Sequence, residues 1–478
     1  MKKVMSVTAA ICLTSVLVLS GCGNGGTTGD GAKSNTSDNG QTKTQSPEGA
    51  ATNDKPYDGV TLRIATVNNP DMVIMKEMSG DFTKETGIRL DFVVLPENDL
   101  REKVTTDVAM NAGMFDIVTI GTYDAPIWAK NQWIDPLTPM FDKISEQAKA
   151  DYDLEDVFPS IRDALSHDGQ LYALPFYGES SMLYYNKDML AKAGVEMPLK
   201  PTWDEVREIA KKVKEANNVP GIVLRGLPGW GEVMAPLNTV INAFGGSWYD
   251  MNWNAQLTSA ETKQAVQFYV DLLNESGQPG PTSTGFTEAL TLLSTGKAAM
   301  WYDATVAAGF LNNPDSSQVV GKIGYAFAPS QAKENNGWLW AWSLAIESAS
   351  KNKEAAFEFI TWATSKKYIE KVGESKGWVV APPGTRTSTY ENPQYKEAAP
   401  FADIVLQSML NADYTKPTKN PVPYQGLQYV AIPEFQQLGT VVSQEIAAAI
   451  SGKQTVEEAL NKAQTVADQI AISGGYKK

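Results

Sequence analysis

The chain has 478 residues, of which 42% are hydrophobic and 20% charged, the composition of a globular protein with room for two or more domains. The formal net charge is -14 at pH 7. Proteins that bind DNA or RNA usually present a basic surface, so this charge argues against nucleic acid as a partner.

The first residues have the pattern of a secretory leader. Lys2 and Lys3 precede an apolar run that reaches Leu19, and the run is too short and wrongly flanked for a membrane-spanning helix. The sequence Leu-Ser-Gly-Cys that ends at Cys22 looks like a bacterial lipobox. We therefore expect a lipoprotein signal peptide over residues 1–21 and a lipid anchor, of the palmitate type, on Cys22. The alternative is an ordinary leader that leaves Cys22 as a free thiol.

A polar segment follows the leader. Residues 22–56 are rich in Gly, Ser, Thr, Asn, Gln and Asp, so they cannot bury enough apolar surface to offset their ordering entropy. We expect a disordered tether that holds the folded body on the extracytoplasmic face of the cell membrane. Its length suits the outer surface of a Gram-positive cell. The other cysteine, Cys12, lies in the leader, so we expect neither a disulfide nor a cysteine metal site in the mature fold.

The first part of the folded body alternates strands with helices. Strands are predicted at residues 60–67, 88–95 and 115–121, and helices at 71–86 and 100–113. This order predicts a mostly parallel, doubly wound α/β sheet, in which ligands bind beyond the carboxyl ends of the strands. The loops at these ends carry Asn68, Asn69, Gly121, Thr122 and Tyr123.

The second part of the body continues the mixture of strands and helices. Residues 172–194 have a strand pattern that turns helical, and Thr202 with Glu205 forms a capping box at the start of a helix. Helices are predicted at 202–216, 238–246, 262–276 and 352–364, short strands at 221–226, 297–305 and 322–330, and a long helical tail up to Ile472.

Three tryptophans lie two residues apart in the sequence NNGWLWAWSLAI. Alternate residues of a strand point to the same face, so Trp338, Trp340 and Trp342 would form one row of indoles. All three could belong to a core strand. The preceding Asn-Asn-Gly indicates that the strand begins at a loop, so we expect Trp338 or Trp340 to stack against a ligand and Trp342 to lie in the core.

Several segments resemble one protein family. The strands TLRIATV and FDIVTIG, the run LYALPFYGESSMLYYNKDMLAKAG and the later segments KAAMWYDATVAAG and KNKEAAFEFITWATSKKYIEKV look like the extracellular solute-binding proteins (family 1, maltose-binding-protein-like) of ABC sugar importers. Within that family, VTIGTYDAPIWAKNQW, RGLPGWGE and WLWAWSLAI resemble the sorbitol- and mannitol-binding branch. The resemblance covers nearly all of residues 57–450.

The resemblance implies an α/β fold of two lobes with hinge crossings and one ligand between them. Lobe 1 would comprise residues 57–176 and 304–360, and lobe 2 residues 177–303 and 361–478. It further implies a monomer that is not an enzyme, needs no cofactor, captures a polyol or sugar of the mannitol, sorbitol or arabitol type by lobe closure, and delivers it to the membrane subunits of an ABC permease.

A polyol presents C–H groups that stack on aromatic faces and hydroxyls that both donate and accept hydrogen bonds. Its pocket should therefore combine Trp or Tyr with Asp, Glu, Asn and Arg. On this criterion and the resemblance, the candidate ligand-binding residues are Asn69, Tyr123, Tyr177, Glu179, Ser180, Arg225, Trp230, Asp303, Trp338, Trp340 and Trp378.

Some of these residues have a second interpretation. Glu179 and its neighbours in PFYGESS could form a capped turn, and Arg225 could be a surface charge. Asp303 alternates with Trp301 inside an apolar strand, where a carboxylate is costly unless it is paired. It could therefore hold Arg225 in a structural salt bridge in place of a ligand.

Two other classes of protein remain possible at this point. A glycoside hydrolase needs two carboxylates at a fixed separation, and no pair is picked out by the sequence. A structural surface lipoprotein would explain the anchor but not the aromatic and acidic residues at loop ends. The single histidine, His167, fits a β-hairpin turn better than a catalytic or metal-binding role, so we expect no metal site.

Overall fold

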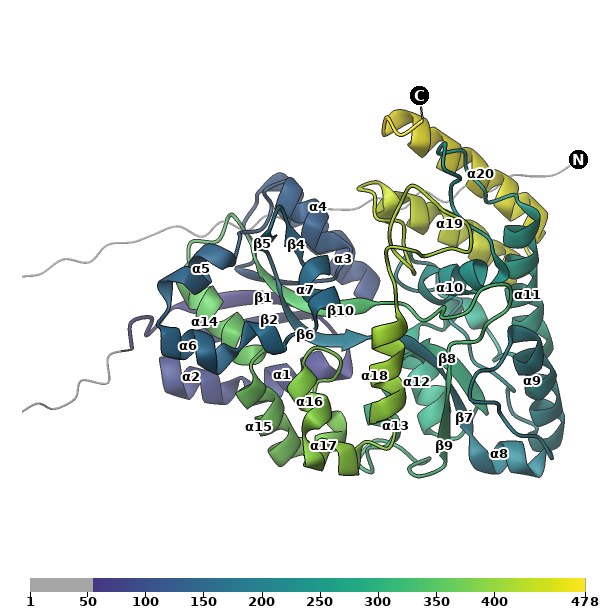
Figure 1. The fold of residues 1–478 in the computed structure, drawn as a ribbon, viewed down its shortest axis with the longest axis horizontal. Coiled ribbons are helices and arrows are strands. Elements are labelled where there is room, and N and C mark those ends of the chain that lie inside the picture. The colour runs from purple at the N-terminus through teal and green to yellow at the C-terminus, as the bar shows by residue number, and fades with distance from the viewer. Residues whose placement is uncertain (1–54, 478) are drawn as a thin grey trace, which may run out of the picture. The chain divides into compact units, whose positions relative to one another are not determined.

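The computed structural model describes residues 55–477 of the chain. The predicted signal peptide, Cys22 and all but the last two residues of the tether lie outside this range. The described residues form a single unit that contains two larger sheets, which we call lobe 1 and lobe 2 together with the helices around each (Figure 1).

Lobe 1 is built on a five-stranded sheet within residues 55–477, in the order β2-β1-β3-β10-β6. The strands β1, β2 and β3 are parallel, whereas β10 runs antiparallel to both β3 and β6. The mixed α/β fold agrees with the prediction from the alternating elements. The strand bounds are β1 Thr61–Val67, β2 Arg89–Leu95, β3 Ile117–Ile120, β6 Leu174–Glu179 and β10 Trp340–Ile346.

These strand directions bring several chain segments to one edge of the sheet. The carboxyl ends of β1, β2, β3 and β6 lie at the same edge as the start of β10, where Trp340 pairs with Glu179. Loops and helix starts that follow parallel strands therefore gather there. This edge of the lobe 1 sheet faces lobe 2.

Lobe 2 contains a three-stranded sheet in the order β8-β7-β9, with all pairs antiparallel. Its strands are β7 Ser181–Asn186, β8 Met300–Ala304 and β9 Ile323–Phe327. The prediction that residues 304–360 belong to lobe 1 is wrong for β9, because β9 pairs with β7 along its whole length. The chain therefore returns to lobe 1 after residue 327.

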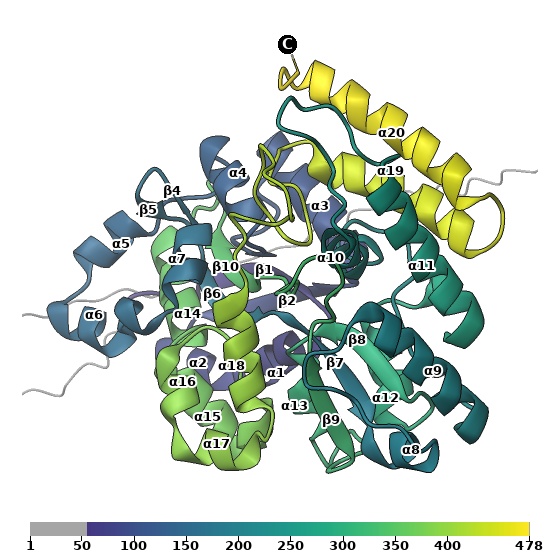
Figure 2. The same cartoon turned by 45° about the vertical axis from the view of Figure 1, so that its right-hand side comes forward.

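Helices surround both sheets (Figures 1 and 2). Around lobe 1 lie α1 Pro70–Met78, α2 Gly80–Thr86, α3 Glu97–Met110, α4 Asp124–Lys130, α5 Thr138–Lys143, α6 Glu146–Tyr152, α7 Pro159–Ala164, α14 Lys353–Ala363, α15 Lys366–Lys376, α16 Thr387–Glu391 and α17 Pro393–Ala398. Around lobe 2 lie α8 Lys187–Lys192, α9 Trp203–Asn217, α10 Met234–Phe244, α11 Ala260–Ser276, α12 Phe286–Ser294, α13 Ala307–Leu311, α19 Phe435–Ile450 and α20 Val456–Ser473.

The predicted boundary at residue 361 also needs correction. Lys376 of α15 bonds Glu77 of α1, and Arg386, just before α16, donates to the carbonyl of Asp153 and pairs with Asp156. These contacts hold α15 and α16 against lobe 1. The helices α19 and α20 pack on α11 of lobe 2, as the prediction for the end of the chain requires.

Three segments connect the two lobes. The first is the junction of β6 and β7 at Ser180, and the second runs from β9 to β10 over residues 328–339. The third contains α18 (Ala402–Asn411), which lies between the lobes in both views (Figures 1 and 2). Crossings of this kind permit the lobes to rotate about a hinge.

Local predictions differ from the structure where tertiary packing intervenes. The helix predicted at 71–86 is divided at Ser79 into α1 and α2. Residues 221–226 form only an isolated bridge, between Val223 and Trp301, and the tail is interrupted between α18 and α19. The capping box of Thr202 and the hairpin turn after His167, between β4 Ser166–His167 and β5 Gln170–Leu171, are confirmed.

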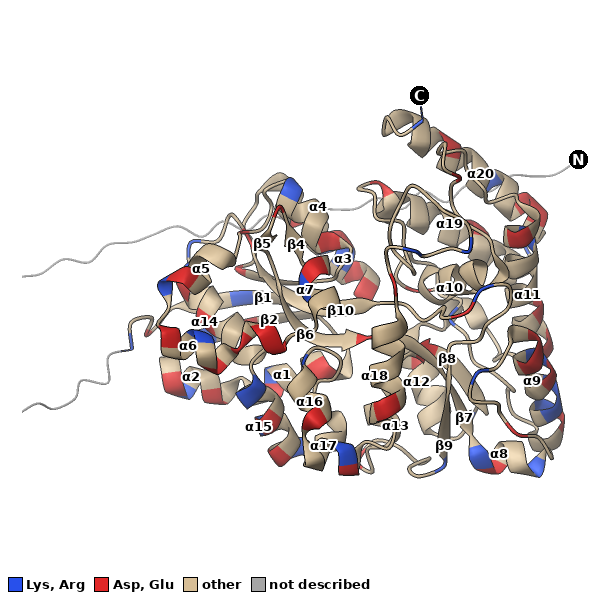
Figure 3. Ribbon diagram, viewed as in Figure 1, with Lys and Arg blue, Asp and Glu red and all other residues tan. Residues whose placement is uncertain are grey.

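The charged residues lie mainly on the outer helices, where both signs mix (Figure 3). Within residues 55–477, no helix is long and apolar enough to cross a membrane. The same part of the chain contains no group of three or more His, Cys, Asp or Glu side chains that could hold a metal ion.

Candidate ligand-binding site

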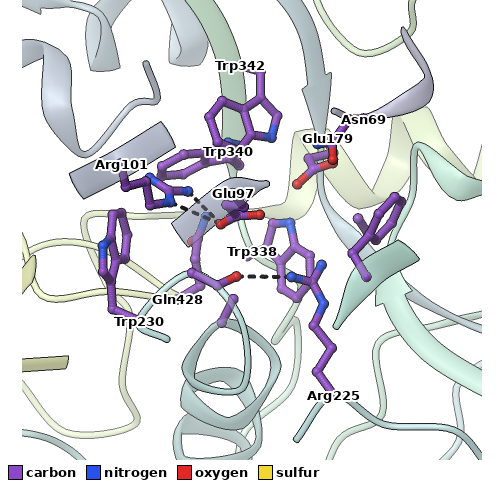
Figure 4. A pocket seen from close by; sticks show the side chains of 14 residues that line it. Asn69, Glu97, Arg101, Glu179, Arg225, Trp230, Trp338, Trp340, Trp342 and Gln428 are labelled. Carbon is purple, nitrogen blue, oxygen red and sulfur yellow. Dashed lines mark hydrogen bonds and ion pairs between the residues drawn. The ribbon is translucent and has the colours of Figure 1, made fainter. Parts of the chain in front are cut away.

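A pocket lies at the edge of the lobe 1 sheet that faces lobe 2 (Figure 4). Its cavity volume is about 30 Å³, room for little more than ordered water, so a larger ligand needs the two lobes or their side chains to part. The lining residues are Asn69, Glu97, Arg101, Glu179, Arg225, Trp230, Gly231, Ala235, Phe286, Ala304, Trp338, Trp340, Trp342 and Gln428.

Lobe 1 contributes residues from the ends of its strands. Asn69 follows β1, and its amide donates to the hydroxyl of Tyr177 over 2.8 Å from Nδ2 to Oη. Glu97 is the first residue of α3, directly after β2, and Glu179 is the last residue of β6. The pairing of β6 with β10 puts Glu179 opposite Trp340. An acid and an indole therefore sit side by side at the pocket.

Lobe 2 contributes a loop rich in glycine, LRGLPGWGE. Trp230 reaches the pocket from this loop, and Gly231 follows it. A Cβ atom on Gly231 would lie 2.1 Å from Oε1 of Glu97, so a larger residue here would displace the side chain of Glu97. The glycine thus leaves room for Glu97 where the two lobes meet at the pocket.

A buried ion pair forms the wall on the lobe 2 side. Arg225 donates from Nε to Oδ2 of Asp303 over 2.8 Å and from Nη2 to Oδ1 over 2.5 Å. Trp301 also donates to Asp303, from Nε1 to Oδ2 over 3.1 Å. The second interpretation of Asp303, a structural salt bridge with Arg225, therefore agrees with the geometry. Arg225 lines the pocket and Asp303 lies behind it.

Several buried polar atoms at the pocket have no partner. Among the residues that the structure describes, no hydrogen bond is made by Nη1 of Arg101, by Nε1 of Trp230, Trp338 and Trp340, or by Oε1 of Gln428. Buried polar groups without partners cost free energy, and such groups in a native protein require an explanation. These four donors and one acceptor belong to residues that line one pocket, which suits a ligand with several hydrogen-bonding groups.

Burial raises the pKa of two acids, Glu179 in the pocket lining and Glu232 beside Arg225 but outside the lining. Burial raises the pKa of Glu179 well above its usual range, although the nearby Arg225 opposes this effect. Burial, followed by the charge of Glu97, raises the pKa of Glu232 to about 8. A protonated Glu179 can donate as well as accept a hydrogen bond, which widens the choice of hydroxyl orientations that it can bind.

The tryptophan row is less regular than an ideal strand. Trp338 precedes β10, and a bulge follows Trp342. The rings of Trp340 and Trp342 meet edge to face at 5.4 Å between centroids, and Trp340 also meets Trp230 at 6.1 Å. Trp338 and Trp340 line the pocket as expected. Trp342 is buried in the core as expected, with 3% of its surface exposed, and it also lines the pocket.

Some predicted site residues lie outside the lining. Tyr177 and Ser180 are fully buried beside it, and Tyr177 holds Asn69. The hydroxyl of Tyr123 donates to the carbonyl of Ile432, and its ring contacts Trp230 at 4.8 Å between centroids. Trp378 packs on Gly373 at the end of α15, away from the pocket. These residues support neighbours of the pocket or, for Trp378, another part of lobe 1.

The sequence prediction missed Glu97, Arg101, Phe286 and Gln428. Glu97 and Arg101 begin the helix directly after β2, so the rule that selected Asn69 at the end of β1 also applies to them. Gln428 comes from an irregular segment whose path no local pattern predicts.

Comparison with known proteins decides the family. A family described as bacterial extracellular solute-binding protein matches residues 67–370. The mannitol-binding protein of Pseudomonas aeruginosa is 44% identical over 421 residues, which cover 87% of this chain and 94% of that protein. The chain belongs to the bacterial extracellular solute-binding proteins. This confirms the family that the sequence segments resembled, and it sets aside the hydrolase alternative, since these relatives are binding proteins.

Two crystal structures of solute-binding proteins share the fold. One, an ABC transporter solute-binding protein from Agrobacterium vitis S4 with bound D-mannitol, is 49% identical, covers 87% of this chain and 99% of its own, and superimposes with a TM-score of 0.84. Another, from Agrobacterium radiobacter K84 in complex with ribitol, is 27% identical over 87% of this chain and 99% of its own, with a TM-score of 0.77.

Proposed function

We propose that this solute-binding protein captures an acyclic polyol, with D-mannitol or D-sorbitol as the leading ligands, for an ABC importer. The observation that carries the proposal is the group of unpaired donors and indoles at the pocket (Figure 4). The mannitol-binding relative and the mannitol-bound structure support the choice of a hexitol, and the ribitol complex supports a pentitol as the next candidate.

The pocket chemistry matches the two kinds of polyol surface. The C–H faces can stack on Trp230, Trp338 or Trp340. Hydroxyls can accept from the indole N–H groups and from Arg101, and can donate to Gln428 and the carboxylates. We propose that Asn69, Glu179, Arg225, Trp230, Trp338 and Trp340, together with Glu97, Arg101 and Gln428, contact the ligand.

Lobe closure provides the binding mechanism. Because the pocket takes side chains from both lobes and encloses little free volume, the ligand must enter when the lobes are apart. Hydrogen bonds made only after closure then stabilise the closed state. The closed protein would be the form that a permease recognises.

The cellular setting is part of the same proposal. The family is extracellular by description, which agrees with an extracytoplasmic location. We propose that Cys22 carries a lipid that tethers a monomer to the membrane of a Gram-positive cell, where it delivers its ligand to the permease subunits. The leader and Cys22 lie outside the described residues.

Isothermal titration calorimetry tests the ligand class. The purified protein is titrated with D-mannitol, D-sorbitol, D-arabitol, ribitol, D-glucose and maltose. We expect one acyclic polyol to bind at least about tenfold more tightly than the sugars. The variant Glu179→Ala, which removes the carboxyl group, should weaken that binding, whereas the surface control Glu275→Ala should not. Binding of sugars alone, or of no compound in the panel, would reject the polyol assignment.

A further inference from the structure

The guanidinium of Arg101 lies among three tryptophans of the pocket (Figure 4). Its Cζ atom is 4.0 Å from the ring centroid of Trp230, 5.0 Å from that of Trp340 and 4.8 Å from that of Trp342. Arg101 comes from α3 of lobe 1 and Trp230 from lobe 2. The three indoles therefore form a cage around a cation that belongs to the protein itself.

Glu97 fixes the guanidinium in this cage. Nε and Nη2 of Arg101 both donate to Oε1 of Glu97, over 3.0 and 2.9 Å. Both side chains are about nine-tenths buried, with 8% and 10% of their surfaces exposed. Nη1 of Arg101 lies 3.8 Å from Oδ2 of Asp124, too far for a hydrogen bond, and bonds no other residue in the described range. Arg101 thus neutralises Glu97 and keeps one free donor.

The remaining acids beside the pocket also leave no unpaired negative charge, because Asp303 is paired with Arg225 and burial raises the pKa of Glu232 to about 8. Arg225 pairs with Asp303 and lies 3.4 Å from Glu232, measured from Nη1 to Oε2. Burial favours the neutral form of Glu179. A ligand that carries an ammonium group would therefore lose its hydration without meeting an unpaired carboxylate.

The same side chains without the guanidinium would suit a cation. Indole faces attract cations through the ring quadrupole, and an unpaired Glu97 would add a full negative charge beside them. Cages of aromatic residues with a nearby acid are a common way to bind organic ammonium ions. The guanidinium of Arg101 occupies the position that such a ligand cation would take.

We propose that Arg101 is a specificity-determining residue, which reserves the pocket for neutral polyols by filling the cage of Trp230, Trp340 and Trp342 and by pairing with Glu97. This proposal rests on the proposed binding of a polyol. Discrimination of this kind depends on what disfavours the wrong ligand as much as on contacts to the right one.

Variants of Arg101 test the proposal by calorimetry at pH 7 with two probes, D-mannitol and 1-amino-1-deoxy-D-mannitol, whose amine is protonated at that pH as a lysine is. The wild type should bind D-mannitol at least about 100-fold more tightly than the amine. In Arg101→Met this ratio should fall at least about tenfold, because the amine gains the cage and Glu97. Arg101→Lys keeps a cation beside Glu97 and should keep the ratio.

The surface variant Arg207→Met serves as a matched control. It removes an arginine that pairs with Glu275 at the exterior and should leave the ratio unchanged. The proposal is overturned if Arg101→Met keeps the wild-type ratio, or if Arg101→Lys changes it as much as Arg101→Met does. A purely structural role would weaken both ligands together.

A measurement on the wild type avoids any folding defect of the variants. The affinity for 1-deoxy-D-mannitol is compared with that for 1-amino-1-deoxy-D-mannitol, since both lack the same hydroxyl and only one carries a charge. We expect the neutral compound to bind at least about tenfold more tightly. Equal affinities would show that the missing hydroxyl, and not the charge, is rejected. Failure of D-mannitol and every other polyol to bind would instead reject the proposed function.

Discussion

Asp303 accepts two hydrogen bonds from Arg225 at a position that water does not reach. The carboxylate also accepts from Trp301 and from the backbone N–H of Ala304. A buried pair of this kind contributes little net stability compared with apolar residues, but removal of one partner leaves the other charge unpaired. Asp303 therefore holds Arg225 in place at the pocket wall and keeps its charge paired inside lobe 2.

The variant Asp303→Asn should lower the free energy of unfolding by about 3–5 kcal/mol, since Arg225 then lacks its counter-charge. Urea denaturation followed by tryptophan fluorescence measures this loss. The matched control is Glu275→Gln, which breaks the partly exposed pair with Arg207 and should cost at most about 1 kcal/mol. Similar small losses in both variants would show that the buried pair is dispensable.

Asp71 lies buried in the first turn of α1, and burial raises its pKa to about 8. The unfolded chain releases this proton near pH 4, so between pH 4 and 8 the folded state holds a proton that the unfolded state has lost. The contribution of this group to stability is thus fully present below pH 4 and is lost as the pH rises towards 8.

Asp71→Asn cannot ionise, so its stability relative to the wild type should rise between pH 5 and 8, by about 2–4 kcal/mol. Urea denaturation at the two pH values provides the comparison. Asp81→Asn is the control, because Lys371 lowers the pKa of this exposed carboxylate and its stability difference should stay constant over the same interval. A constant difference for Asp71→Asn would mean that Asp71 is ionised in the folded protein.

At the scale of elements, α3 and the residue before α4 contact the loop that carries Trp230, the segment before α19 and α19 itself. Nδ2 of Asn98 donates to the carbonyl of Pro228 over 3.0 Å, and Oγ1 of Thr105 bonds Oε1 of Gln436 over 3.2 Å. The hydroxyl of Tyr123 donates to Ile432 and accepts from the backbone N–H of Gln436 over 3.1 Å. These bonds join lobe 1 to lobe 2 without passing through the ligand pocket.

Tyr123→Phe removes two of these bonds and keeps the ring. A net hydrogen bond is worth about 0.5–1.5 kcal/mol, so the affinity for the bound polyol should fall about two- to tenfold through a less stable closed state. Calorimetry measures the change. Tyr368→Phe in α15 is the control, because the hydroxyl of Tyr368 has no hydrogen-bond partner within residues 55–477. Unchanged affinity in Tyr123→Phe would show that the hydrogen bonds of Tyr123 do not stabilise the closed state.

At the scale of the whole molecule, the hinge brings two crossings into direct contact. Gly337 precedes Trp338 in the second crossing, and Ser180 lies in the first. A Cβ atom on Gly337 would lie 2.5 Å from Oγ of Ser180, which is fully buried. The backbone N–H of Trp338 also donates to Oγ of Ser181. A side chain at position 337 would therefore displace Ser180 in the first crossing.

Gly337→Ala should push the two crossings apart and favour a more open arrangement. We expect weaker polyol binding, by about fivefold or more, together with a larger radius of gyration in small-angle X-ray scattering without ligand. Gly80→Ala in α2 has open space around the added methyl group and should change neither quantity. An unchanged radius of gyration and polyol affinity in Gly337→Ala would show that the contact between Gly337 and Ser180 does not control the opening of the lobes.

Much of the architecture follows from local patterns in the sequence. Helical periodicity and the capping box of Thr202 predict α9, and alternation predicts β1 and β2, because neighbouring residues alone decide which face of an element is apolar. The same reasoning with the rule for strand ends places Asn69 at the site. Two predictions are wrong: β9 was assigned to lobe 1, and residues 221–226 were expected to form a strand. Both errors arise where strand pairing depends on segments distant in the chain.

The sequence by itself determined the family and the α/β class, since periodicity, composition and segment resemblance are local properties. Only the tertiary structure decided that Asp303 is bound to Arg225, that Tyr123 joins the lobes, and that Arg101 lies among three tryptophans. The physical reason is that hydrogen bonds and ring contacts join residues more than 70 positions apart, such as Arg225 and Asp303, and their partners are chosen by packing.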